Sequence, residues 1–105
     1  MIKVNYRISH DRTVRFSMKG HANFASYGND LVCAAASSIG VGLLNAMDIM
    51  AEGSCKIDLQ DDAILVEVTD VNNEVLQNIL EVGRIQLETL QEQFPENIRV
   101  EKTEV

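Results

Sequence analysis

The first twenty residues alternate between apolar and polar side chains, which is typical of a β-strand with one buried face. Apolar side chains recur at every second position in two runs: Ile2, Val4, Tyr6 and Ile8, then Val14, Phe16 and Met18. Polar residues 10–12 separate the runs, so the pattern predicts a β-hairpin, and Gly20 is expected to end its second strand.

A loop and a long apolar helix are expected next. Residues 20–30 follow neither the strand period nor the helix period and contain two glycines, which predicts a loop. Residues 31–52 are rich in alanine and other apolar residues, which favours a helix with Asp30 as its N-cap and Gly53 at its end. Gly40 and Gly42 lower the stability of such a helix and indicate that another backbone packs closely there.

The second half of the chain repeats this order. Alternating residues 55–59 and 64–68 flank the polar residues 60–62 and predict a second hairpin. Residues 71–93 predict an amphipathic helix, whose apolar stripe contains Leu76, Ile79, Leu80, Gly83, Leu87 and Leu90. Pro95 prevents continuation of the helix, and Ile98 and Val100 alternate with charged residues in a final strand.

These elements predict a single domain over residues 1–105, of the α+β class. Their order is ββαββαβ, and we expect a two-layer sandwich in which two helices cover a mainly antiparallel sheet. The first helix is apolar on nearly every side, which is more than one sheet and one neighbouring helix can cover. A second copy of the chain would cover the remainder, so we expect a homodimer.

The net charge of the chain limits the kinds of molecule that are expected to bind it. Nine Lys and Arg against sixteen Asp and Glu give a formal charge of −7, which argues against direct nucleic-acid binding and leaves basic proteins as possible partners. The chain starts without the pattern of a secretory signal, so reduced thiols in the cytoplasm are expected. Residues 31–47 are uncharged but fall short of the roughly 20 residues that cross a bilayer, which favours a buried helix without membrane contact.

The chemistry of the chain concentrates on Cys33 and His21. A thiol attacks as its thiolate, which the positive end of a helix and a nearby imidazole both favour. Cys33 falls in the first turn of the predicted helix, and His21 lies at the far end of the loop that returns to it. Backbone N–H groups near Cys33 and Ala34 could hold the oxyanion of an acyl-transfer intermediate.

Each of these residues also has a structural interpretation. A cysteine in an alanine-rich helix is commonly a core residue, and a loop histidine is commonly a polar surface residue. Asp30 could orient His21 or only cap the helix, and Tyr27 could line a substrate site or anchor the loop. Ser37 or Ser38 could face the site, or bond back to the helix.

The remaining candidate ligands do not form a recognisable site. Cys55 alternates with apolar strand residues and is expected in the core, and His10 is expected to be a solvated turn residue. Two cysteines and two scattered histidines lack the spacing of a zinc site, so no metal and no cofactor is expected. A redox role has no support because no second cysteine lies in a C-x-x-C pair.

Two stretches carry a family resemblance. Gly20-His21-Ala22, followed by Tyr27-Gly28-Asn29-Asp30-Leu31-Val32-Cys33-Ala34-Ala35, resembles the motif of the Prp family of ribosomal-processing cysteine proteases, and the element order matches that family. The resemblance implies a catalytic dyad of Cys33 and His21. It also implies removal of an N-terminal extension from the precursor of a bacterial large-subunit ribosomal protein, a homodimer, and a flexible loop at residues 22–30. The glycines themselves predict that Gly20 and Gly28 are the flexible points of this loop.

One position departs from the family pattern. Many members have an acidic residue after G-H-A, whereas this chain has Asn23, which leaves Asp30 as the acidic residue within the motif. A noncatalytic, ribosome-associated binding module that pairs a peptide with an exposed sheet edge is the alternative function, and it would need no reactive thiol.

Overall fold

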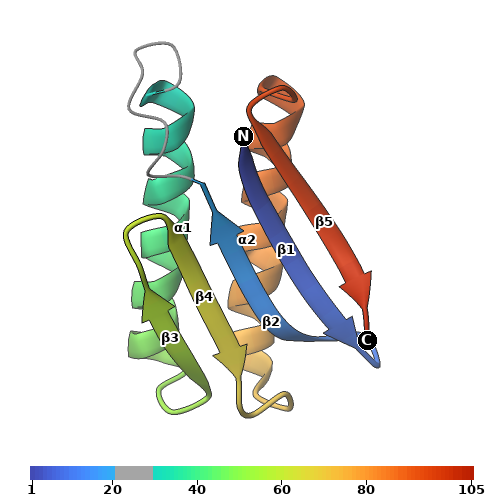
Figure 1. Ribbon diagram of the computed structural model, residues 1–105. Coiled ribbons are helices and arrows are strands. Elements are labelled where there is room, and N and C mark those ends of the chain that lie inside the picture. The colour runs from blue at the N-terminus through green and yellow to red at the C-terminus, as the bar shows by residue number, and fades with distance from the viewer. Residues whose placement is uncertain (21–29) are drawn as a thin grey trace.

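The computed structural model describes residues 1–20 and 30–105. Of Asp30 it describes only the backbone, which belongs to a helix. Within these residues the elements follow the predicted order: β1 (Ile2–Ser9), β2 (Arg12–Lys19), α1 (Asp30–Met50), β3 (Cys55–Leu59), β4 (Ala63–Val68), α2 (Glu74–Gln93) and β5 (Ile98–Glu104). The strands form one sheet of order β3-β4-β2-β1-β5. Both helices lie on the same side of this sheet (Figure 1), which confirms the two-layer α+β sandwich.

The sheet is mainly antiparallel, as predicted, with one parallel pair. β1 pairs antiparallel with β2, and β4 pairs antiparallel with both β2 and β3. β5 returns beside β1 in parallel, with Ile2 opposite Ile98 and Val4 opposite Val100. Helix α2 makes the crossover from β4 to β5 that a parallel return requires.

The turn between β1 and β2 consists of His10 and Asp11, both at positive φ (51° and 64°), as in a two-residue type I′ hairpin. The pairing shifts by one residue after Arg7, because Arg7 faces Arg15 whereas Ile8 faces Thr13. Because of this shift, β2 does not follow the strict alternation of apolar and polar positions that was predicted for it.

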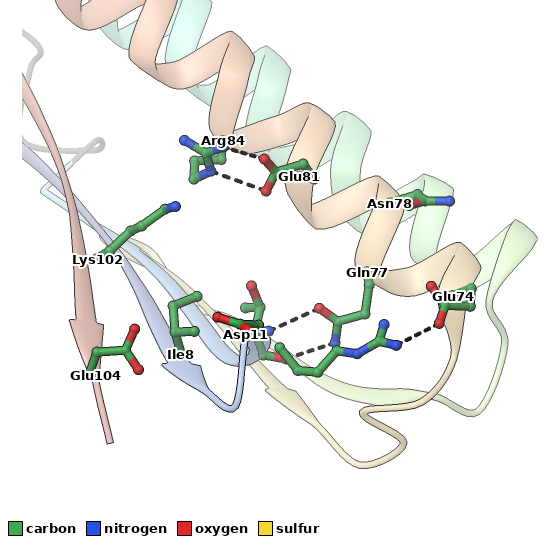
Figure 2. A pocket seen from close by; sticks show the side chains of 11 residues that line it. Ile8, Asp11, Glu74, Gln77, Asn78, Glu81, Arg84, Lys102 and Glu104 are labelled. Carbon is green, nitrogen blue, oxygen red and sulfur yellow. Dashed lines mark hydrogen bonds and ion pairs between the residues drawn. The ribbon is translucent and has the colours of Figure 1, made fainter.

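The shift changes which side chains of β2 are buried. It also leaves the backbone of Thr13 to be paired by a group outside the strands. Thr13 is buried and Val14 is only half-buried, although the sequence pattern placed Val14 in the core. The side-chain amide of Gln77 takes the place of a neighbouring strand here: it accepts from the Thr13 N–H and donates to the Thr13 carbonyl, both at 2.9 Å (Figure 2). An ion pair between Arg12 and Glu74, 2.6 Å long, also joins the hairpin to α2.

The helix boundaries differ slightly from the prediction. α1 begins at Asp30 and ends at Met50, rather than spanning 31–52, and α2 begins at Glu74 rather than at residue 71. The start of α2 is fixed by Asn73, whose side chain accepts a hydrogen bond from the Leu76 N–H at 3.0 Å. The predicted apolar stripe of α2, including Gly83, is buried.

The core lies between the sheet and the helices, with Tyr6, Phe16, Met18 and Ile64 among its most buried side chains. Leu31–Met50 is long and apolar enough to cross a membrane by length and composition, and it supplies core residues such as Ala36 and Met47. In the second hairpin, Cys55 and Ile57 pack at the core's edge and Leu59 is 59% exposed, because β3 is an edge strand.

Gly40 and Gly83 mark close approaches between α1 and its neighbours. A Cβ at Gly40 would collide with the Met18 side chain and come within 2.8 Å of Ile64, so α1 lies tightly on β2 and β4 here. A Cβ at Gly83 would collide with Leu43, which brings α2 close to α1. The expectation of close packing was wrong for Gly42, where no other described part of the chain comes within 4 Å of an added Cβ. At Gly40 the neighbours are side chains rather than backbone.

The two glycines of α1 therefore predict opposite effects on stability. Gly40→Val should lower the free energy of unfolding by about 1–3 kcal/mol, because the added atoms overfill the helix–sheet contact. Gly42→Ala should raise it by about 0.5–1 kcal/mol, because the site has room and alanine favours helix. Urea denaturation of both variants and the parent chain at one protein concentration checks this, and a Gly40→Val chain as stable as the parent would contradict the packing described.

Candidate active site

Cys33 lies in the first turn of α1, the position predicted for a nucleophile. The residues beside it hold the helix to the core, since Val32 is 2% exposed and Ala36 is fully buried. Leu31 and Ala34 lie on the exposed side. Cys33 is half-buried at the boundary between the two sides and packs against the core, so its position follows from the packing of α1.

The structure selects one of the two candidate serines. Ser37 follows Cys33 by one helical turn, and its Oγ lies 4.0 Å from the Cys33 Sγ. Ser37 is half-buried, whereas Ser38 is exposed on the outer side of α1. A hydroxyl at this position can donate to a thiolate, so Ser37 is the serine placed to act on the sulfur.

The first turn of α1 also offers backbone donors. The first four N–H groups of a helix have no acceptor within it, and they carry the positive end of the helix dipole. Cys33 and Ala34 lie at this end of α1, which begins at Asp30. That their N–H groups hold the oxyanion stays a prediction.

Gly20 fixes the other end of the predicted loop. It adopts φ = 88°, which favours glycine, and its N–H donates to the Asp62 carbonyl at 2.8 Å. The end of β2 is thereby tied to the turn between β3 and β4, directly before His21. His21, Ala22, Asn23, Tyr27 and Gly28 lie outside the described residues, as does the side chain of Asp30, so the pairing of Cys33 with His21 stays a prediction.

The other candidate ligands lie apart from Cys33 in the fold. Cys55 begins the edge strand β3, where burial raises the pKa of its thiol, a hydrogen bond with Ser54 lowers it and the charge of Asp48 raises it. His10 is exposed in the β1–β2 turn, as predicted, with its Nδ1 3.1 Å from the Ser9 Oγ. Among the described residues no group of three His, Cys, Asp or Glu side chains is arranged to hold a metal ion.

A hollow of about 490 Å³ lies between the β1–β2 turn, α2 and β5 (Figure 2). Arg84 and Lys102 share it with carboxylates such as Glu81 and Glu104. None of the predicted site residues that the structure describes, Cys33 included, lines this hollow.

Comparison with known proteins places the chain in a family. A family model described as cysteine protease Prp matches residues 1–99. The chain belongs to the cysteine protease Prp family. It is 34% identical to the ribosomal processing cysteine protease Prp of Bacillus subtilis over 107 aligned positions, covering 95% of this chain and 96% of the relative.

Solved structures of the family enzyme from Staphylococcus aureus have the same fold. Its complex with a substrate peptide matches with a TM-score of 0.90 and 30% identity, over 98% of this chain and 100% of that one. Its complex with a covalently linked product peptide matches with a TM-score of 0.88 and 31% identity, over the same shares of the two chains. The fold described above is therefore one on which the S. aureus enzyme holds peptides.

The two thiols of this family member should differ in reactivity. Iodoacetamide near neutral pH should label Cys33 faster than Cys55, because Cys33 lies at the positive end of a helix, whereas burial raises the pKa of Cys55 and keeps it protonated. The raised pKa also means that labelling of Cys55 should increase only at more alkaline pH. Peptide mapping by mass spectrometry measures both rates, and urea-unfolded chain, where both should react alike, is the control. Faster labelling of Cys55 would contradict the assignment.

Proposed function

We propose that this chain is a cysteine endopeptidase that removes the N-terminal extension of a bacterial large-subunit ribosomal protein. In this proposal Cys33 is the nucleophile and His21 is the general base. The observation that carries it is the position of Cys33: a half-buried thiol in the first turn of α1, in a chain whose family has a solved complex with a covalently linked product peptide. The chain's match to the B. subtilis ribosomal processing protease supports the substrate class.

The proposed reaction begins when His21 takes the proton of the Cys33 thiol. The thiolate attacks the scissile carbonyl, and backbone N–H groups at the start of α1 stabilise the oxyanion. His21 then protonates the leaving amine, and water hydrolyses the thioester to release the product. Ser37, beside the sulfur, donates to the thiolate before attack.

The substrate and the compartment agree with the charge of the chain. Ribosomal proteins are rich in basic residues, and a formal charge of −7 attracts such a partner during encounter. We place the reaction in the cytoplasm, where the thiols of Cys33 and Cys55 stay reduced.

The noncatalytic alternative would pair a peptide with an open edge of the sheet. The edge strands are β3, with Lys56 and Asp58 exposed, and β5, with alternating charges from Arg99 onward. Charged side chains along an edge strand are a common protection against strand pairing. The charged edge strands therefore favour the protease function over the noncatalytic binding module.

Replacing either member of the dyad should abolish or strongly reduce cleavage. Cys33→Ala should remove activity, because no other described thiol lies at a helix start, and His21→Ala should lower kcat/KM by about 100-fold or more, the usual scale for a general base. Mass spectrometry of the precursor protein after incubation measures cleavage. Cys55→Ala is the matched control and should cleave like the parent chain, whereas substantial cleavage by Cys33→Ala would refute the proposal.

The helix layer also supports the proposed homodimer. An apolar groove of about 360 Å³ runs between α1 and α2, lined by Leu43, Ala46, Met50, Val75, Asn78, Ile79 and Val82. Met50 is 63% exposed and Val82 is 53% exposed, and Ile49 beside them is 81% exposed. Exposed apolar side chains gathered in this way are typical of an interface, and the outer side of α1, which is uncharged from Leu31 to Asn45, extends it. A second copy of the chain is the occupant that we propose.

A charge in the groove should separate the two copies. Val82→Glu should weaken dimer formation by at least about 100-fold, because an unpaired carboxylate is costly to bury. Leu59→Glu, an equally exposed apolar position on β3, should leave the dimer intact. Sedimentation equilibrium measures both, and a parent chain that is monomeric at micromolar concentration would contradict the dimer.

A further inference from the structure

The side of the sheet turned away from the helices is unusually basic. None of the described elements covers this open face, which is turned toward the viewer in Figure 1. The outward positions of the strands hold six of the nine Lys and Arg residues: Lys3, Arg7, Arg15, Lys19, Lys56 and Arg99. They hold three acidic residues, Asp58, Glu67 and Glu101. The open face thus carries +3, and the rest of a chain of charge −7 carries −10.

Strand pairing sets these cations side by side in rows. Lys19 of β2 faces Lys3 of β1, which in turn faces Arg99 of β5, so three cations from adjacent strands form one row. Arg15 faces Arg7 in a second row. Neighbouring strands are about 4.8 Å apart, and the rows are four residues, or about 13 Å, apart along the strands. Like charges directly opposite each other destabilise a sheet, and a bound polyanion would relieve this repulsion.

The cations are only weakly neutralised by their neighbours. Arg15 and Glu67 approach to 3.7 Å, and Arg99 and Glu101 to 3.9 Å, in exposed and loose ion pairs of the kind that contribute little. For Lys3, Arg7 and Lys19 the structure records no ion pair within the described residues. These side chains are available to an external anion.

Two shallow hollows on the open face combine cations with neutral hydrogen-bonding groups. One, of about 370 Å³, is lined by Asn5, Arg7, Arg15, Ser17, Lys19, Thr103 and Glu104. The other, of about 350 Å³, adjoins it at Asn5 and includes Lys3, Arg99 and Glu101. Asn5 and Ser17 face each other between the two cationic rows, where they can bond to sugar hydroxyls.

We propose that the open face of the sheet binds RNA through its phosphates. The face is broad and polar, and it matches an extended sugar-phosphate strand or the shallow minor groove of an RNA helix, whereas it cannot enter a DNA major groove. No outward-facing residue of the described strands is aromatic, so binding should depend on phosphate and 2′-hydroxyl contacts and be largely independent of base sequence.

The overall negative charge predicted no nucleic-acid binding, but the fold separates the charges. The acidic residues of α2, such as Glu74 and Glu88, lie in the helix layer behind the sheet. At physiological ionic strength, charges more than about 8 Å apart are largely screened from each other. An RNA strand on the open face therefore encounters the local charge of that face.

The cationic row of Lys19, Lys3 and Arg99 lies at the end of the sheet from which the chain leaves for α1 (Figure 1). If the proposed function holds, RNA bound to this row would bring the Cys33 end of the enzyme to a ribosomal particle that carries its substrate. RNA binding itself is measured without substrate, so the result of that measurement does not depend on the protease assignment.

Fluorescence anisotropy with a labelled single-stranded oligouridylate tests the proposal. About five phosphate contacts should give a slope of about −3.5 for log K against log salt, or about 100-fold weaker binding at about 200 mM than at about 50 mM salt. Lys3→Gln should make that slope shallower by about 0.7. Lys3→Glu should weaken binding at least about 10-fold, because it places a negative charge between Lys19 and Arg99.

Lys102→Glu is the matched control. Lys102 lies on β5 beside α2, with Arg84 and Glu81 (Figure 2), so the same charge change on the covered side should leave RNA binding within about two-fold. Circular dichroism confirms folding of each variant. No binding at low salt, or equal loss in Lys3→Glu and Lys102→Glu, overturns the proposal. Equal binding of polyglutamate or of the same DNA sequence overturns its assignment to RNA.

Discussion

The contact of α1 with β2 and β4 is the constraint on which the rest of the structure depends. Gly40 lets the helix lie directly on Met18 and Ile64, and the buried side chains of Val32 and Ala36 continue the contact toward the start of the helix. Cys33 belongs to the same buried turn, so core packing holds the sulfur in place. The proposed nucleophile is thus positioned by the packing of the fold, and its predicted partner His21 lies in sequence between Gly20 and the first turn of α1.

Helix α2 completes this arrangement and makes the two sides of the sheet different. It packs against α1 at Gly83 and holds the β1–β2 hairpin through Gln77, whose amide pairs with the backbone of Thr13. Both helices consequently cover one side of the sheet and leave the other open. The candidate catalytic thiol and the apolar groove belong to the helix layer, and the cationic rows belong to the open face.

Most of the fold could be predicted because each element has its own local signal. The alternation in β1, the apolar stripe of α2 and the polar turns gave the correct order of elements. The errors occur where a distant residue decides the outcome. Gln77, sixty-four residues away, satisfies the backbone of the β2 irregularity that buries Thr13 in place of Val14. Close packing was expected at Gly40 and Gly42 but occurs at Gly40 and Gly83, because the sequence alone does not say which side of α1 meets the sheet.

The family, the two-layer class and the position of Cys33 in a first helical turn follow from the amino-acid sequence alone, because short motifs and hydrophobic periods are local properties of the chain. The folded arrangement was needed to establish that Ser37 rather than Ser38 lies at the sulfur, since this depends on how α1 is rotated against the core. It also decided the distribution of charge. Lys3, Lys19 and Arg99 are far apart in the sequence, and strand pairing brings them into one row on a chain whose total charge is negative.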